Sequence, residues 1–179
     1  MKANPAGALE VAKNLRSPAL KVFRRSAFGL LGLVFITVMS GGLVAGLDAG
    51  LIYNEFPKMG LGLTPPKSEL FDKFYSRKED HSDLWWRNML ENPSTVQMDH
   101  RILAVTTFTA VLALFAFSRK GSVARVLPKN AKKGAMGLVH LVTLQAALGI
   151  STLIYMVPIP LAAAHQAGSL LVFTGALVL

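Results

Sequence analysis

The sequence has 179 residues, of which 52% are hydrophobic and 16% are charged, and its mean hydropathy is +0.44. This length would suit one or two soluble domains, but the composition is too apolar for a water-soluble globule. Residues 134–179 contain no Lys, Arg, Asp or Glu. At about 1.5 Å per helical residue, that stretch can cross a hydrocarbon core of about 30 Å twice. A soluble enzyme is therefore excluded as the leading interpretation, and we expect an all-α integral membrane protein.

The absence of cysteine and the distribution of charge narrow the class of protein further. The chain has no cysteine, which excludes a disulfide framework, a thiolate zinc site and an iron–sulfur cluster. The net charge of +9 is unevenly distributed along the chain. Six basic residues and one acid lie in 1–25, and six basic residues and no acid lie in 119–134. The segment between them, 48–98, holds six basic and eight acidic residues. The positive-inside rule predicts this alternation for connections on opposite sides of a membrane. No nucleic-acid partner is expected, because no aromatic or glycine motif interleaves the basic runs.

Four membrane-spanning helices are predicted, forming a four-helix transmembrane bundle with both chain ends on the basic side. Their approximate ranges are 27–47, 93–118, 134–156 and 161–179. The second begins at Pro93 because proline suits the first helical turn. Pro158 and Pro160 form the turn before the fourth, since proline has no N–H to continue a helix. The connection 48–92 is long enough to hold structure of its own.

Three shorter features each have two interpretations. The N-terminal 25 residues are similar to a mitochondrial presequence, but they would equally serve as a linker. Gly42, Gly46 and Gly50 recur every four residues, a pattern typical of helix packing or of room for a flat ligand. Trp85 and Trp86 are expected to anchor the chain at the membrane surface, with a substrate or partner contact as the alternative.

The four histidines are the candidate functional residues, and depth in the membrane separates them. His81 lies in the polar loop, where a solvated or salt-bridged role is expected. The others lie in or beside apolar spans, where an ionisable residue is a functional candidate. Measured from the face of the acidic loop, His100 lies about 10 Å deep, His165 about 6 Å and His140 about 24 Å. Only His100 and His165 share a level, and His140 is expected to make a polar contact within the bundle.

Two neutral histidines on separate helices at one depth are what bis-axial heme ligation needs. Small or apolar residues on the same helix faces would leave room for a porphyrin: Leu103, Ala104 and Thr107 beside His100, and Gly168, Ser169 and Val172 beside His165. Zinc is the rival, but it usually needs a third protein ligand, and only Asp99 is available at that depth. Two structural histidines bonded across helices are the remaining alternative. Arg101 could pair with a heme propionate or lie among lipid headgroups.

Three stretches of the sequence resemble a known family. They are VAGLDAGLIYNEFPKMG (44–60), DLWWRNMLENPSTVQMDHRILA (83–104) and LGISTLIYMVPIPLAAAHQAGSL (148–170), and together they closely resemble heme A synthase of mitochondria, the cytochrome c oxidase assembly factor. The loop 69–86 is most similar to the fungal branch. The likeness covers nearly the whole chain from about residue 27. Members of this family have eight transmembrane helices in two similar halves, and the sequence resembles the C-terminal half.

The resemblance implies an activity and a division of labour. The family oxidises the C8 methyl group of heme O to a formyl group, which gives heme A. The DHR and AHQ motifs identify His100 and His165 as the expected axial ligands of heme b in the C-terminal half. The substrate pocket, with an essential glutamate, belongs to the N-terminal half, so no catalytic residue can be carried over. The chain is expected to be a fragment or a short product that keeps the cofactor half, with 1–26 as a basic matrix-side linker and 27–179 as the heme-binding membrane domain.

The resemblance also implies partners and a location. They are heme O as substrate, ferredoxin and ferredoxin reductase as electron donors, and heme O synthase as a candidate partner. The expected location is the mitochondrial inner membrane, crossed several times, with 48–92 in the intermembrane space, and a homo-oligomer is expected. Two other functions stay open at this point: a self-standing four-helix transmembrane cytochrome b for electron transfer, and a heme-free structural subunit.

Overall fold

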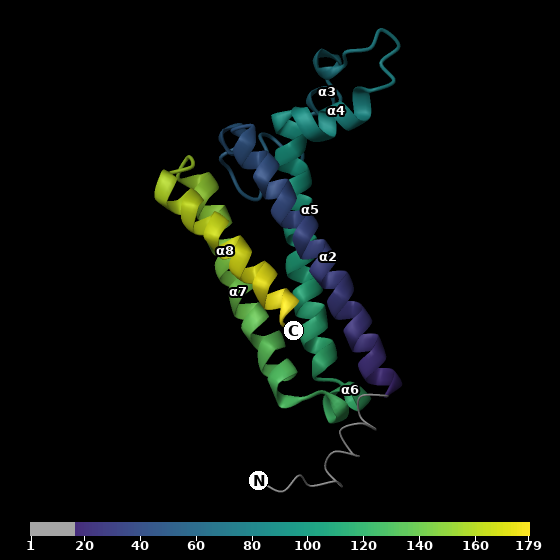
Figure 1. The fold of residues 1–179 in the computed structure, drawn as a ribbon. Helices are drawn as coiled ribbons and strands as arrows, with labels where there is room; N and C mark the ends of the chain where they lie inside the picture. Colours follow the sequence, from purple (N-terminus) through teal and green to yellow (C-terminus); the bar gives the residue numbers. More distant parts are fainter. Residues whose placement is uncertain (1–16) are drawn as a thin grey trace, which may run out of the picture.

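The computed structural model describes residues 17–179, which fold almost entirely into helices and connecting loops (Figure 1). The helices are α2 (Pro18–Gly46), η1 (Ala49–Leu51), α3 (Lys67–Leu70), η2 (Lys73–Tyr75), α4 (Leu84–Glu91), α5 (Pro93–Ser118), α6 (Gly121–Val126), α7 (Lys129–Ile154) and α8 (Ile159–Leu177). Within the described residues there is no β-strand, and one isolated bridge joins Met59 to Gly62. The predicted all-α fold class is confirmed.

Four long helices build a bundle made of two hairpins, α2 with α5 and α7 with α8 (Figure 1). Helices α2, α5 and α7 are each long and apolar enough to cross a membrane. Helix α8 is shorter, at 19 residues, and carries two polar side chains, His165 and Gln166, in its first half. Helix α2 packs on α5 and α8, and α7 also packs on α5 and α8. Helices α5 and α8 therefore occupy diagonal corners of the bundle.

The helices begin where the sequence supplies start signals. Pro18, Pro93 and Pro160 each lie in the first turn of a helix, where a missing N–H costs nothing. Asn92 caps α5, because its side chain accepts a hydrogen bond of 3.0 Å from the backbone N–H of Ser94.

Two helices are longer than the apolar stretches that predicted them. Helix α2 starts at Pro18, so the range 1–26, expected to be a linker, is helical in its last part, while 1–16 lie outside the described residues. Helix α7 starts at Lys129 rather than near residue 134. Both extensions carry basic side chains that are exposed or half-buried, and a helix can continue past the hydrocarbon when such residues reach the interface.

The apolar core fills the half of the bundle farthest from the loop 48–92. Its buried side chains come from α2, α5, α6, α7 and α8 and are Leu20, Phe23, Leu30, Val34, Val111, Leu114, Val123, Leu127, Leu138, Val142, Val172 and Ala176. The rings of Phe23 and Phe117 stack there with centroids 6.3 Å apart. Among the described residues, this cluster does not reach the loop-side ends of the helices, where His100 and His165 lie.

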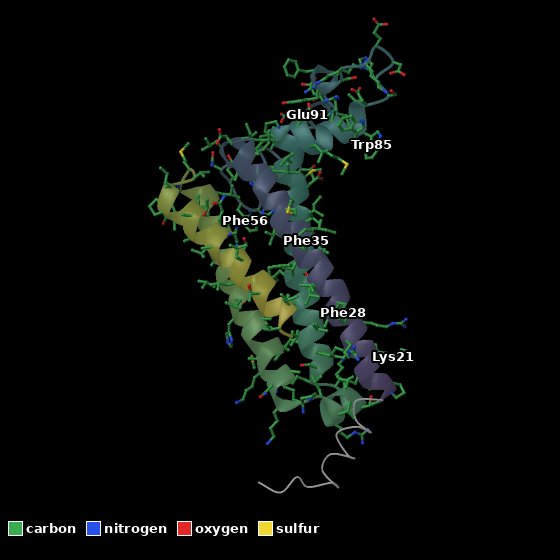
Figure 2. The ribbon with its side chains drawn as sticks, viewed as in Figure 1. Lys21, Phe28, Phe35, Phe56, Trp85 and Glu91 are labelled. Carbon is green, nitrogen blue, oxygen red and sulfur yellow. The ribbon has the colours of Figure 1, made fainter. Side chains whose placement is uncertain are left out.

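The loop 48–92 forms a small folded head at one end of the bundle, which confirms that it holds structure of its own (Figure 1). Figure 2 shows Trp85 and Glu91 at this end and Lys21 at the other. Buried Asp83 organises the head by accepting hydrogen bonds from Ser76 Oγ at 2.6 Å, Arg77 N at 3.0 Å and Arg87 Nε at 2.7 Å. These bonds, the one from Ser76 first, hold the pKa of Asp83 well below its usual range.

The turn between α7 and α8 explains one of the three spaced glycines. Met156 and Val157 adopt φ values of 59° and 56°, a region that a β-branched residue rarely enters. A Cβ atom at Gly50 would lie 3.1 Å from Cγ2 of Val157, whereas one at Gly42 or Gly46 would meet nothing within 4 Å. Within the described residues, Gly42 and Gly46 therefore pack against no other helix, while Gly50 allows the loop to lie against the turn.

Candidate functional site

Two of the four histidines lie at the same end of the bundle. His100 is in the second turn of α5 and His165 is in the second turn of α8, so both lie near the head, on diagonal helices. The sequence predicted that these two residues would share a level, and the structure places both in the second turn of a helix at the head-side end of the bundle.

A hydroxyl group on α2 fixes the orientation of the His100 ring. Ser40 Oγ donates to the carbonyl oxygen of Thr37 at 2.8 Å and lies 2.8 Å from Nδ1 of His100. A hydroxyl group has one hydrogen, and this one is used on Thr37. Ser40 must therefore accept a hydrogen bond from Nδ1–H of His100. The neutral ring then carries its lone pair on Nε2, which is the atom free to bind a metal.

A second hydroxyl pair continues this polar seam between α2 and α5. Thr37 Oγ1 donates to the carbonyl oxygen of Leu33 at 2.9 Å and lies 2.7 Å from Oγ1 of Thr107. By the same count of hydrogens, Thr107 donates to Thr37. Thr107 is buried and links α5 to α2 two helical turns away from His100. Its side chain is therefore part of the packing between these helices.

Glycine makes room for each histidine ring. A Cβ atom at Gly41 of α2 would lie 3.1 Å from Cε1 of His100, and one at Gly149 of α7 would lie 2.8 Å from Cε1 of His165. A Cβ contact of 3.1 Å is unusually tight, and one of 2.8 Å is essentially never seen in closely packed proteins. The His100 ring therefore packs against the backbone of α2, and the His165 ring packs against the backbone of α7.

The surroundings of His165 contain fewer hydrogen bonds. Its Nδ1 is buried and has no hydrogen-bond partner among the described residues. Gln145 of α7 donates from Nε2 to the backbone carbonyl of His165 at 2.7 Å, while its Oε1 is buried without a partner. A Cβ atom at Gly168 would lie 2.3 Å from that Oε1. Gly168 therefore serves the contact between α7 and α8, rather than only leaving space beside His165.

Arg101, next to His100, attaches the loop to α5. Its Nη1 donates to the carbonyl of Lys58 at 2.9 Å, and its Nη2 donates to the carbonyl of Tyr53 at 3.0 Å. Gln97, one turn earlier, donates to the carbonyls of Ala49 at 2.8 Å and Tyr53 at 3.1 Å. The Nε of Arg101 is buried and has no partner within the described part of the chain. Arg101 thus holds the loop and keeps one donor unused.

The same loop reaches the other hairpin. Asn54 Nδ2 donates to the carbonyl of Gly50 at 2.9 Å and to that of Leu153, at the end of α7, at 3.0 Å. Tyr53 donates its hydroxyl hydrogen to Glu69 at 2.6 Å. Burial, with this bond and the charge of Glu69, raises the pKa of Tyr53 to about 12. The loop therefore spans the head-side end of the bundle from α5 to α7.

The other two histidines lie elsewhere. His81 is exposed in the head at φ 52°, in keeping with the solvated role expected for it. His140 is exposed on the outside of α7 and makes no hydrogen bond to the described residues, so the expected polar contact inside the bundle is wrong. The helix period directs His140 away from the core formed by Leu138 and Val142.

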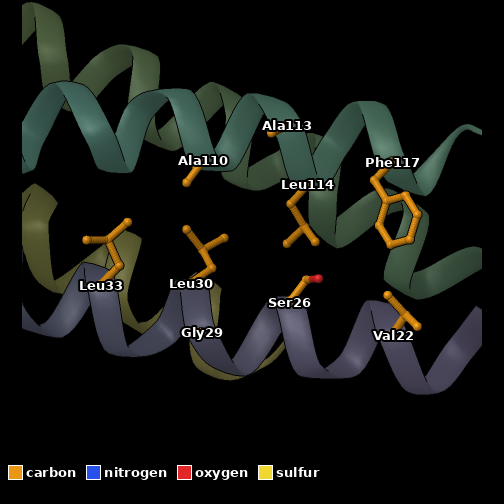
Figure 3. A pocket seen from close by; sticks show the side chains of 9 residues that line it. All are labelled: Val22, Ser26, Gly29, Leu30, Leu33, Ala110, Ala113, Leu114 and Phe117. Atoms are coloured by element: carbon orange, nitrogen blue, oxygen red, sulfur yellow. The ribbon is translucent and has the colours of Figure 1, made fainter.

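The two histidines are too few to hold a bare metal ion, but they could bind a metal whose other ligands come from a cofactor. In residues 17–179, no group of three or more His, Cys, Asp or Glu side chains could hold a metal ion, and zinc sites need at least three protein ligands. A separate hollow of about 490 Å³ lies between α2 and α5, at the far end from the histidines. Its lining is apolar except for Ser26 and has no titratable group, so it offers no comparable chemistry (Figure 3).

The fold is that of an all-α integral membrane protein, with one histidine near the same end of each of two diagonal helices. The family model described as cytochrome oxidase assembly protein, COX15-CtaA, matches residues 4–177. The chain belongs to this family, and the resemblance seen in the sequence is confirmed.

Individual relatives agree with this assignment. The chain is 58% identical over 161 residues to the heme A synthase–mitochondrial ferredoxin fusion protein of Schizosaccharomyces pombe, covering 89% of the chain and 26% of that protein. It is 49% identical over 175 residues to heme A synthase COX15 of Saccharomyces cerevisiae, covering 98% and 36%. It is 48% identical over 154 residues to the human protein of the same name, covering 86% and 34%. The chain thus spans about a third of the length of these curated relatives. No solved structure matches it.

Proposed function

We propose that this chain is the heme b-binding, C-terminal half of a heme A synthase, the enzyme that oxidises the C8 methyl group of heme O to a formyl group. The observation that carries the proposal is the placement of His100 and His165 at the same end of two diagonal helices, with the Nε2 lone pair of His100 left available by Ser40. The two imidazoles would be the protein ligands that hold the iron of a bound heme.

The residues present fit such a group on independent grounds. His165 has a buried Nδ1 without a partner among the described residues, so packing, and a heme when bound, would set the orientation of the ring. Glycines lie behind both rings, which leaves room for each imidazole between the helices of its hairpin. When bound, heme b supplies one-electron redox chemistry. The protein side chains hold the rings in place, fix the tautomer of His100 and cover the head-side end of the site.

Arg101 is proposed to pair with a heme propionate. Its guanidinium contacts no carboxylate within the described residues, where the three ion pairs all involve Arg77 or Arg87 in the head. A half-buried guanidinium bonded only to neutral oxygens favours an anionic partner. Its unused Nε is the donor available for that contact.

The remaining parts of the enzyme are proposed to lie outside this chain. The described helices contain one mid-span imidazole, His140, and no mid-span glutamate, so this chain alone would lack the catalytic half. Heme O is the proposed substrate, and ferredoxin with its reductase is the proposed electron source. The fusion of a heme A synthase to mitochondrial ferredoxin in one relative supports that source. The proposed location is the mitochondrial inner membrane, with 48–92 in the intermembrane space; heme O synthase and further copies of the chain are candidate partners.

The test is to express the chain in cells that make heme O but lack heme A synthase, and then to extract and separate the hemes. We expect the purified chain to carry heme b and the cells to contain no heme A. Co-expression with the missing half should restore heme A. A heme A peak that depends on this chain alone would contradict the division of labour, and a purified chain without heme would contradict the binding role.

A further inference from the structure

A second site of a different kind lies at the end of the bundle opposite the histidines. There, a hollow of about 420 Å³ is lined by Arg119, Lys129, Lys132, Lys133 and Met136. It forms where α5 ends and α7 begins, beside the short helix α6 (Figure 1). Four cationic side chains therefore surround one hollow.

Within residues 17–179, these cations have no acidic partner. Residues 119–134 contain six basic residues and no acid, and the three ion pairs found in residues 17–179 all lie in the head. Helix α7 begins at Lys129 without a side-chain cap and without an acidic residue in its first turn. Its N-terminal N–H groups and dipole add to the positive potential of the hollow.

Neutral contacts hold two of the cations in place. Lys132 Nζ donates to the carbonyl of Ala124 in α6 at 2.5 Å. The guanidinium of Arg119 lies 5.0 Å from the centroid of the Phe115 ring. Neither contact neutralises the charge. Lys129 and Lys133 are exposed, and their side chains make no hydrogen bond within the described part of the chain.

One wall of the hollow is apolar and lies on a helix that could span a membrane. Met136 lies two turns into α7, one of the helices long and apolar enough to span a bilayer. The hollow therefore joins a cationic rim to hydrocarbon. A phospholipid combines these two features, because its phosphate lies at the membrane surface and its chains run alongside the helix.

We propose that this hollow binds the headgroup of an anionic phospholipid, with the phosphodiester among Arg119, Lys129, Lys132 and Lys133 and the acyl chains past Met136. Free phosphate shares the headgroup chemistry, but it would gain nothing from the apolar wall. The site is distinct from the histidine pair and does not depend on the proposed redox role.

The test measures lipid binding to the full chain by native mass spectrometry, with phosphatidylglycerol, diphosphatidylglycerol and phosphatidylcholine in turn. The double variant Lys129→Gln/Lys133→Gln removes two charges from the hollow. The matched control, Arg24→Gln/Arg25→Gln, removes two exposed charges from the first part of α2, outside the hollow. Helical circular dichroism checks that both variants fold.

We expect the two anionic lipids to bind and phosphatidylcholine to bind much more weakly. The hollow variant should lose affinity by about fivefold for each charge removed, while the control should lose much less. Equal losses in both variants would mean a general surface-charge effect and would overturn the proposal. Displacement of the lipid by millimolar inorganic phosphate, at ionic strength matched with chloride, would overturn the lipid as ligand.

Discussion

The two histidines occupy similar positions in the two hairpins, but they are held in different ways. His100 of α5 donates to Ser40 and rests on Gly41, both of α2. His165 of α8 rests on Gly149 of α7, more tightly, and its Nδ1 has no partner among the described residues. One ring is therefore oriented by a hydrogen bond and the other by shape.

This difference predicts different sensitivities. A hydrogen bond fixes both the angle of a ring and the nitrogen that carries its proton. Close packing against a glycine fixes the angle alone. Substitutions behind His165 should therefore act by displacing the ring, whereas loss of the hydroxyl behind His100 should act on the electronic properties of the ligand.

The largest effect is expected from removing either ring. His100→Ala and His165→Ala should each abolish the low-spin bis-histidine visible spectrum, because one axial imidazole cannot maintain six-coordination. His81→Ala and His140→Ala should leave it largely unchanged, since neither side chain lies near the pair. If His140→Ala removed the spectrum while His165→Ala did not, the pairing would be wrong.

A smaller effect is expected from filling the space behind a ring. Gly149→Ala should displace His165, because the new Cβ would lie 2.8 Å from Cε1, and overpacking of this kind costs about 1–3 kcal/mol. Gly41→Ala should cost less, since its Cβ would lie 3.1 Å from Cε1 of His100. The readout is the rate of heme loss to a scavenger. Gly42→Ala, where nothing lies within 4 Å, is the control. A larger loss rate in Gly41→Ala than in Gly149→Ala would reverse the comparison.

A change in redox potential is expected from removing the hydroxyl group. Ser40→Ala leaves Nδ1–H of His100 without its acceptor, which makes the imidazole a weaker electron donor. The ferric state should be less stabilised, so the midpoint potential of the bound heme should become more positive. Ser40→Thr keeps a hydroxyl oxygen as the acceptor, so its midpoint potential should match that of the unsubstituted chain. An unchanged potential in Ser40→Ala would show that Ser40 serves packing alone.

The smallest effect on the ring pair is expected from the head. The pKa of Asp83 is lowered in the folded chain, so its contribution to stability is complete above the unfolded value of about 3.9 and is lost as the pH falls below it. Amide exchange in residues 76–91 should rise over that range, and Asp83→Asn should remove the pH dependence. The heme spectrum of Asp83→Asn should match the parent. A change in ligation would mean that the head supports the rings.

Depth along apolar helices was enough to predict which histidines lie at the same end of the bundle, because position in a span follows from counting residues. The direction in which a side chain points was harder to predict. His140 faces outward, and Gly41 rather than Gly42 approaches the ring, because the rotation of each helix depends on packing with its neighbours. Ser40 had no signal of its own, since its partner lies 60 positions away in the chain.

The loop contacts illustrate the same limit. The sequence indicated Arg101 as a candidate beside His100, but its bonds to Tyr53 and Lys58 depend on how the loop folds back and were not predicted. Gln97 and Asn54, which attach the same loop to both hairpins, are ordinary polar residues in the sequence. Gly149 could have been found as a small residue in an apolar helix, but only the fold shows that it lies behind His165.

The most direct test of the account is a combined electron paramagnetic resonance and near-infrared magnetic circular dichroism measurement on the purified chain. We predict one low-spin ferric heme per chain with two neutral imidazole ligands, and its loss in His100→Ala and in His165→Ala. A high-spin or five-coordinate signal, or bis-imidazole ligation that survives either substitution, would contradict a heme held between the two hairpins.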